Sequence, residues 1–245
     1  MKDKILRVLY PEKCPVCAEP LTKEDRYENN PFICKTCYKN AGFADGVRCI
    51  RCAKPLEDET EPFCKECMEK ERYFDRGFAL LRHDEMAKNV IYGFKFRYEL
   101  DNIRFPALEA ALRYGKEILQ LKTQAFIPVP LHKSRKRERG YNQARLLAEE
   151  ISKYMLLLYG SAPPCDSTYL LRKKKTRYQR DLDPGYRAEN VKDAFCVAGD
   201  PEKDYKFLCV VDDIYTTGST IDSCAKTLKA SGCSKVFFLV VSIVG

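Results

Sequence analysis

The stretch FLCVVDDIYTTGST, residues 207–220, decides the fold class of this chain. Five apolar residues run into two adjacent aspartates, Asp212 and Asp213, and then into a loop made almost wholly of threonine, serine and glycine. A short, Val-rich run that ends in charge is typical of a buried strand in a parallel sheet whose carboxyl end reaches solvent. Ligands bind at that end of such sheets. The stretch therefore predicts an α/β domain with a binding site directly after this strand.

The segments around this stretch alternate between strand and helix patterns. Strands are expected at RGFALL (76–81), QAFIPVPL (124–131), STYLLR (167–172), AFCVAG (194–199) and KVFFLVVSIV (235–244). Helices are expected at 84–96, 106–121, 142–158 and 219–230. Such alternation implies a mostly parallel sheet covered by helices, so we place an α/β domain at 73–245.

Composition limits the class of protein. The 245 residues are 45% apolar and 32% charged, as in soluble globular proteins. The opening MKDKILRVLY is too short and too charged for a signal peptide, and the longest apolar runs are too short for a membrane span. We therefore expect a cytoplasmic protein without membrane insertion. The net charge of +8 favours anionic partners such as phosphorylated ligands, nucleic acid or membrane surfaces.

Eight of the thirteen cysteines form four CxxC pairs within the first 72 residues. These are Cys14 and Cys17, Cys34 and Cys37, Cys49 and Cys52, and Cys64 and Cys67. Each pair suits a metal knuckle, and two knuckles complete a tetrahedral zinc site. A disulfide framework is the alternative, but the chain shows no secretory signal. We therefore predict a double zinc ribbon at 1–72 that binds two Zn²⁺ ions.

The order of the ligands leaves two arrangements open. Sequential ribbons, in which the first two pairs share one zinc and the last two share the other, are simpler than a cross-braced arrangement. Polar segments such as KEDRYENN cannot form a core, so folding here should depend on metal. Because every ligand is a cysteine, no position is left for a reactive water, and the zincs are expected to be structural. The other five cysteines are expected to be ordinary thiols: Cys165, Cys196, Cys209, Cys224 and Cys233.

The loop after Asp213 has the composition of a phosphate site. It combines a helix N-terminus with hydroxyl groups and a glycine that permits close backbone approach. Its residues are Thr216, Thr217, Gly218, Ser219 and Thr220. The carboxylates before it would repel a phosphate, so neutral hydroxyls or a metal cation are their expected partners. Together these features predict a phosphorylated sugar with free hydroxyls as the ligand.

Two other interpretations of this loop are weaker. A hydrophobic run ending in DD also occurs in P-loop nucleotide hydrolases, but the chain contains no GxxxxGK[ST] motif. A plain strand-to-helix turn capped by aspartates would not need so many hydroxyls.

The segment VVDDIYTTGST resembles the phosphoribosyl pyrophosphate (PRPP) signature of type I phosphoribosyltransferases. With LRVLYPEKCPVC, GFKFRYE, PVPLHKSRKRERGYNQARLLA and RKKKTRYQ, the chain resembles the ComF family of competence-associated proteins, ComFC type, over nearly its whole length. The resemblance implies a phosphoribosyltransferase-like PRPP-binding domain behind a double zinc ribbon. It also implies that Asp212 and Asp213 are catalytic and bind the ribose hydroxyls, directly or through Mg²⁺. Residues 216–220 would then hold the 5′-phosphate.

Two basic segments carry further implied roles. The segment 129–140 stands where transferases of this fold receive pyrophosphate, and 171–190 resembles the loop that closes over PRPP. The candidate donors are Lys133, Arg135, Arg137, Arg139, Lys174, Lys175 and Arg177. Guanidinium groups chelate phosphate oxygens in bidentate fashion. His132 lies among them and is expected to be a passive neighbour.

Three functions remain open from the sequence. The first is phosphoribosyl transfer from PRPP to a nitrogen acceptor, for which no acceptor pocket is recognisable. The second is single-stranded DNA binding through the basic loops, with Tyr141, Tyr178 and Tyr186 stacking on bases. The third, implied by the resemblance, is an adaptor whose zinc module docks a competence helicase during DNA uptake in natural transformation.

Overall fold

The computed structural model describes residues 11–56, 60–96, 100–132, 135, 137, 139–173, 194–198 and 203–245. The helices are α2 (Lys35–Lys39), α3 (Lys65–Glu69), α4 (Glu85–Phe96), the short 3-10 helix η1 (Leu100–Ile103), α5 (Arg104–Gln120), α7 (Gln143–Tyr159) and α9 (Ser219–Ala230). The strands are β1 (Arg76–Arg82), β2 (Ala125–Pro128), β3 (Leu170–Arg172), β4 (Phe195–Val197), β5 (Phe207–Tyr215) and β6 (Lys235–Ile243).

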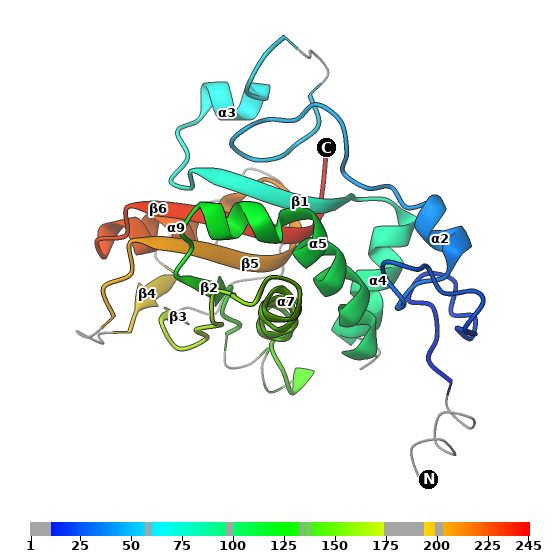
Figure 1. Ribbon diagram of the computed structural model, residues 1–245. Helices are drawn as coiled ribbons and strands as arrows, with labels where there is room; N and C mark the ends of the chain where they lie inside the picture. Colours follow the sequence, from blue (N-terminus) through cyan, green and yellow to red (C-terminus); the bar gives the residue numbers. More distant parts are fainter. Residues whose placement is uncertain are drawn as a thin grey trace.

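A four-stranded parallel sheet forms the centre of the molecule, with strand order β1-β6-β5-β2 (Figure 1). Residues 208–211 of β5 and 236–243 of β6 are buried, because both strands have neighbours on each side and helices over both faces. The prediction of a parallel α/β sheet is confirmed. Its central strand β5 carries the acidic pair at its carboxyl end.

The two expected strands that precede and follow the second basic segment do not join this sheet. Within the described residues, β3 and β4 pair with each other, run antiparallel and form a sheet of their own. Unlike the long buried runs of β5 and β6, each of these three-residue strands buries only its first residue, Leu170 in β3 and Phe195 in β4. They form a separate two-stranded ribbon near β2 in Figure 1.

Side chains from alternate positions of the strands feed two apolar cores. Val211 of β5 belongs to the core shared with α4, α5 and α7, and Val210 belongs to the core shared with α9. Neighbouring residues of a strand point to opposite faces of the sheet, which accounts for this division. The same alternation decides where Asp212 and Asp213 lie.

The N-terminal region consists of two small ribbons that repeat one local structure. In the first, the Cys14 N–H donates to the carbonyl of Glu19, and Lys13 and Pro20 form an antiparallel bridge. In the second, the Cys49 N–H donates to the carbonyl of Lys54, and Arg48 and Pro55 form an antiparallel bridge. Each first knuckle is followed by an alanine with positive φ, Ala18 and Ala53.

The two ribbons pack on opposite cores of the α/β unit. Ile33 of the first ribbon is fully buried in the core of α4 and α5, whereas Cys52 of the second lies in the core that holds α9. Figure 1 accordingly shows α2 beside α4, and α3 above β1. The boundary at residues 72 and 73 stays a prediction, since the ribbons and the α/β unit share both cores.

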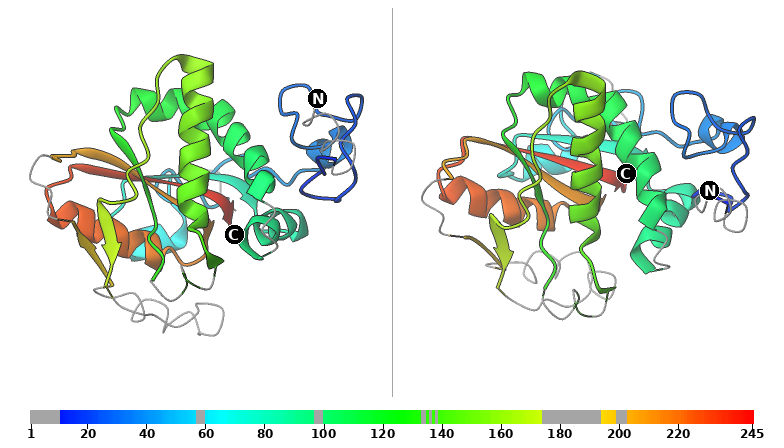
Figure 2. Two further views of the ribbon diagram at one scale, coloured as in Figure 1. Left: turned by 90° about the horizontal axis from the view of Figure 1, so that it is seen from below. Right: turned by 60° about the horizontal axis from the view of Figure 1, so that its bottom comes forward.

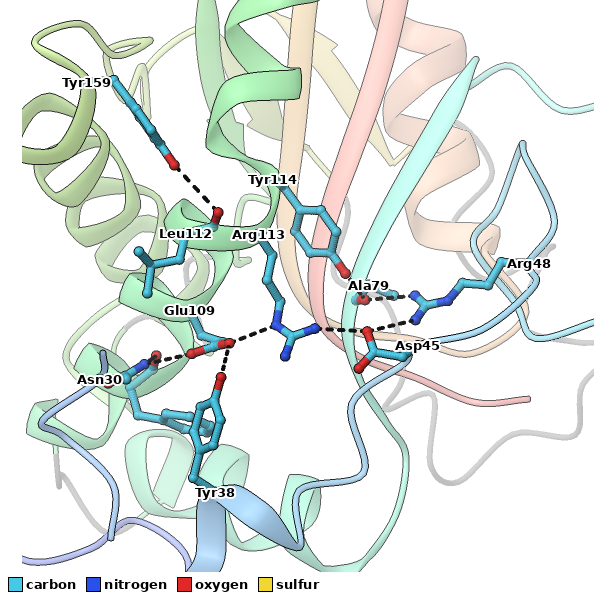
Figure 3. A network of polar contacts seen from close by, with 11 residues as sticks. Asn30, Tyr38, Asp45, Arg48, Ala79, Glu109, Leu112, Arg113, Tyr114 and Tyr159 are labelled. Atoms are coloured by element: carbon cyan, nitrogen blue, oxygen red, sulfur yellow. Dashed lines mark hydrogen bonds and ion pairs between the residues drawn. The ribbon is translucent and has the colours of Figure 1, made fainter. Parts of the chain in front are cut away.

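A buried polar network joins the first ribbon to the α/β unit (Figure 3). Its centre is Glu109 of α5, which is 2% exposed. The Glu109 carboxylate accepts hydrogen bonds from Asn30 Nδ2 at 3.1 Å, from the Tyr38 hydroxyl at 2.9 Å and from Arg113 Nε at 2.7 Å. Arg113 also reaches the carboxylate of Asp45 at 2.8 Å. A buried charge with this many partners fixes the ribbon's orientation on α5.

Candidate functional site

The polar loop after β5 leads directly into α9. Gly218 is the N-cap of α9 and supplies no side chain to cap its first turn, so the first backbone N–H groups of the helix point to the carboxyl edge of the sheet. The hydroxyls of Thr217 and Ser219 are hydrogen-bonded to each other at 2.8 Å, and both side chains are partly buried. Hydroxyls and helix N–H groups thus meet at one place, as an oxyanion site requires.

Gly218 is required at this loop for two reasons. Its φ is +76°, a conformation that residues with a side chain rarely adopt. A Cβ atom there would also lie 2.3 Å from the hydroxyl oxygen of Tyr215, whose ring lies beneath the loop. The Tyr215 side chain is 1% exposed, and its hydroxyl has no hydrogen-bond partner among the residues that the structure describes. The loop therefore rests on a buried aromatic ring.

Asp213 lies on the face of the sheet that α4 and α7 cover. It is 5% exposed, and its Oδ2 is 2.5 Å from Lys95 Nζ and 3.3 Å from Gln143 Nε2. Burial by itself would raise the pKa of this carboxyl, but Lys95, Arg139 and the Gln143 hydrogen bond together hold it below its usual range. Asp213 is consequently an ionised carboxylate that the protein already neutralises.

Asp212 has a different environment. It is partly buried on the opposite face, where Arg172 of β3 and Cys224 of α9 are its electrostatic neighbours. Burial and the charge of Asp213 raise the pKa of Asp212 to about 7. Its Oδ1 accepts the backbone N–H of Asp213 at 2.9 Å. A neutral hydroxyl or a cation at this edge would stabilise the ionised form of Asp212.

Two arginines stand near the acidic pair. Burial lowers the pKa of Arg172, and the positive charge of Arg135 lowers it further, so the two guanidinium groups lie within electrostatic reach of each other. The Arg172 guanidinium also lies over the ring of Phe195, 5.3 Å from its centroid. Like charges held together at the edge of a site favour an anion between them.

The structure places the predicted basic residues unequally. Arg139 is buried beside Asp213, Arg135 is partly buried towards Arg172, and Arg137 is exposed. Lys133, Lys174, Lys175 and Arg177 lie outside the described residues. Tyr141 donates its hydroxyl to the carbonyl of Phe94, which gives this ring a structural contact. Tyr178 and Tyr186 also lie outside the described residues.

Sequence reasoning gave no role to Lys95 or Gln143. Both lie within segments that carried the family resemblance, GFKFRYE and GYNQARLLA. No local pattern pairs them with Asp213, because the contacts span different elements of the fold. The one feature of the sequence that could have indicated Lys95 is its position as a lysine between Phe94 and Phe96 at the end of the expected helix 84–96.

The cysteines form two groups of four, Cys14, Cys17, Cys34 and Cys37, and Cys49, Cys52, Cys64 and Cys67. Within each group the sulfur atoms lie within 4.8 Å of one another. The knuckles also have the N–H to sulfur contacts of metal ribbons, from Cys37 N to Cys34 Sγ and from Cys52 N to Cys49 Sγ, both 3.4 Å. The groups fit two structural zinc ions in the sequential arrangement, which resolves the alternative left open by the sequence.

The fold and the two groups of cysteines define the class of this protein: an α/β protein with a parallel sheet and an N-terminal double zinc ribbon. A family model described as "Double zinc ribbon domain" matches residues 5–68. Over 223 residues the chain is 32% identical to competence protein F of Haemophilus influenzae, which covers 84% of this chain and 94% of that protein. The chain therefore belongs to the ComF family of competence proteins.

Other relatives agree with this assignment. DNA utilization protein YhgH of Escherichia coli K12 is 27% identical over 230 residues, which cover 92% of this chain and 94% of that protein. Competence protein ComFC of Bacillus subtilis is 27% identical over 212 residues, covering 82% and 79% respectively. No helix in the described parts of this chain is long and apolar enough to cross a membrane.

Proposed function

We propose that this protein binds PRPP at the carboxyl edge of β5 and acts in the uptake or use of DNA. The observation that carries the proposal is the set of groups at this edge: Asp212 with its raised pKa, the carboxylate of Asp213 neutralised by Lys95, and the N-terminus of α9, which has no side-chain cap. In the proposed complex the loop 216–220 holds the 5′-phosphate and the aspartates hold the ribose hydroxyls. The names of the relatives support the role in DNA uptake or use.

Mg²⁺ fits this proposal through Asp212. Lys95 already occupies Oδ2 of Asp213 at 2.5 Å, whereas Asp212 lacks such a partner lysine in direct contact among the described residues. Magnesium in proteins commonly takes one or two carboxylates and completes its shell with substrate phosphates and water. The ion would neutralise charge on the pyrophosphate group while Asp212 orients it.

Phosphoribosyl transfer is the reaction that the arrangement would support. A nitrogen nucleophile forms a bond to the anomeric carbon of PRPP, the carbon–oxygen bond to pyrophosphate breaks, and pyrophosphate leaves with that electron pair. Arg172 and Arg135 would stabilise the departing charge, since cations placed at the developing anion lower the barrier. Lys133, Lys174, Lys175 and Arg177 remain proposed donors on the two basic segments.

Calorimetric titration of PRPP, with and without Mg²⁺, tests the binding. We expect saturable binding that the Asp212→Asn/Asp213→Asn variant loses by at least about tenfold, because both ribose contacts are weakened. A matched control is Asp101→Asn/Asp204→Asn, which changes the net charge equally at two exposed positions. Wild-type protein that does not bind PRPP, or a site variant that binds as well as the control, would refute the proposal. Release of pyrophosphate with a nitrogen acceptor then separates a transferase from a PRPP-binding protein.

A second candidate function is non-catalytic binding of single-stranded DNA, or an adaptor role towards a competence helicase, through the same phosphate site. The net charge of +8 favours it. Affinity for an oligonucleotide should then fall steeply with salt, and Lys174→Ala/Lys175→Ala should flatten the slope by roughly one to two units. Affinity that does not change with salt would exclude this candidate.

A further inference from the structure

A cavity lies at the same edge of the sheet as the acidic pair. It has a volume of about 390 Å³, at the small end of the range for ligand pockets. Its walls come from the residue after β1, from α4 and from the penultimate residue of β5. They are His83, Lys88, Asn89, Ile91, Tyr92 and Ile214. Figure 2 shows the end of β6 and the C-terminus near α4, on this side of the molecule.

The cavity is adjacent to the proposed PRPP site on two elements. Ile214 directly follows Asp213 in β5, so one strand end contributes to both. On α4, Ile91 lines the cavity, and Lys95, one turn later, binds Asp213. Residues four apart on a helix lie on the same face, about 5–6 Å apart. A molecule in this cavity would thus lie next to whatever Asp212 and Asp213 bind.

His83 is held in a fixed position within the cavity wall. Its Nδ1 is 2.9 Å from Ser242 Oγ, and its backbone N–H donates to the carbonyl of Ile243. Ser242 is fully buried and is the single polar residue in the run 236–243 of β6. A buried hydroxyl in an apolar strand is costly unless it is hydrogen-bonded, and the contact with His83 satisfies the hydroxyl of Ser242. The same contact orients the imidazole.

The lining has the composition of a site for a flat heteroaromatic ring. Tyr92 is 45% exposed and offers an aromatic face, the partly buried Ile214 offers apolar surface, and the buried Ile91 also belongs to the wall. His83 and Asn89 add an imidazole and a carboxamide, which pair with ring nitrogens and exocyclic groups of bases. Among the residues that the structure describes, no carboxylate lines the cavity and Lys88 does, so a cation is not the expected ligand.

We propose that this cavity binds a nucleobase, with Tyr92 stacking on the ring and His83 and Asn89 meeting its polar edge. The base is either the nitrogen acceptor of the transfer, an assignment that rests on the proposed function, or a base of single-stranded DNA held beside the phosphate site. Both sources present the same chemistry to the cavity, and the experiment distinguishes them.

Saturation-transfer NMR and calorimetry with free adenine, guanine, cytosine and uracil, a short oligothymidine and an abasic oligonucleotide test the proposal. Wild-type protein should bind at least one free base or the oligothymidine more tightly than the abasic strand. Tyr92→Ala should weaken that binding roughly tenfold, and Tyr92→Phe should retain it, because stacking needs the ring and not the hydroxyl. Tyr73→Ala is the matched control, since Tyr73 is a tyrosine of similar exposure, 40%, outside the cavity.

The outcomes separate this inference from the proposed function. Binding of a free base identifies an acceptor site, and binding of the oligothymidine alone identifies a DNA site. If no base binds in either form, or if Tyr92→Ala binds like Tyr73→Ala, the inference is overturned. PRPP titration of the same variants is read independently: Tyr92→Ala should bind PRPP as wild type does, and failure of wild type to bind PRPP contradicts only the proposed function.

Discussion

The zinc-ribbon region and the α/β unit reach a folded state by different means. In the described part of the ribbons, residues 11–56 and 60–72, the helices α2 and α3 have five residues each, and the cysteine ligands Cys14, Cys49, Cys52 and Cys67 are buried. The α/β unit buries long apolar runs, of which residues 236–241 of β6 are the clearest case. We therefore expect metal–sulfur bonds to supply much of the folding free energy of the ribbons, whose buried apolar residues, such as Leu21 and Ile33, pack into a core shared with the α/β unit, whereas hydrophobic burial dominates in that unit. The two regions should respond differently to the same perturbation.

Zinc removal is the test with the largest expected effect. Metal binding by small zinc domains contributes about 10–16 kcal/mol to their folding, so a strong chelator should abolish hydrogen-exchange protection in residues 11–56. Protection in β5 and β6 should persist. Elemental analysis should find two zincs per chain before treatment, one for each four-cysteine group.

The control for zinc binding uses cysteines of similar burial. Cys34→Ser removes a partly buried ligand, and Cys196→Ser changes a partly buried cysteine outside both groups. Only the first should lower the zinc content. Equal loss of protection in both regions on chelation would mean that the ribbons and the sheet fold as one unit, and the comparison would fail.

Breaking the polar network around Glu109, which joins the first ribbon to α5, should have the next largest effect on stability. Glu109→Ala removes the acceptor of Asn30, Tyr38 and Arg113 and leaves the Arg113 charge partly buried. Breaking a buried pair in this way costs about 3–5 kcal/mol in the free energy of unfolding. Denaturant unfolding followed by circular dichroism measures it.

Glu117→Ala is the matched control on the same helix. Its carboxylate pairs with Arg76 at 2.5 Å, but the two side chains are 34% and 43% exposed, and such pairs contribute about 0–1 kcal/mol. If both variants lose the same free energy of unfolding, the Glu109 network does not stabilise the contact between the ribbon and the α/β unit more than an exposed ion pair would.

The smallest predicted effect concerns the partly buried carboxyl group of Asp212 in β5. Because the pKa of Asp212 is raised to about 7, the folded state binds this proton more tightly than the unfolded state does. Stability of the wild type should fall as pH rises from about 4 to about 7. Asp212→Asn has no proton to lose there, so it should be more stable than wild type at pH 8, by on the order of 1 kcal/mol or more, and the difference should shrink at pH 4.

Thermal unfolding between pH 4 and pH 8 in the absence of PRPP checks this expectation. Asp204→Asn, an exposed position, should leave the pH profile unchanged. A profile of Asp212→Asn that runs parallel to that of wild type would mean that Asp212 is ionised in the folded protein throughout this range.

The sequence by itself determined the features whose cause is local. Four CxxC pairs specify two metal groups, because two intervening residues direct both sulfurs to one ion. Apolar runs such as 207–211 specify buried strands, and alternation with helices specifies a parallel sheet. The hydroxyl-rich loop at the end of β5 was likewise readable, since its glycine and helix N-terminus are neighbours in the chain.

Only the tertiary structure decided the relations between distant segments. It brings the first two cysteine pairs to one group, pairs β3 with β4 apart from the main sheet, and places Lys95 and Gln143 on Asp213. The opposite environments of Asp212 and Asp213 follow from strand alternation combined with the particular helices on each face. Such contacts join residues far apart in the chain, and their geometry depends on how the helices and strands pack, which no local pattern encodes.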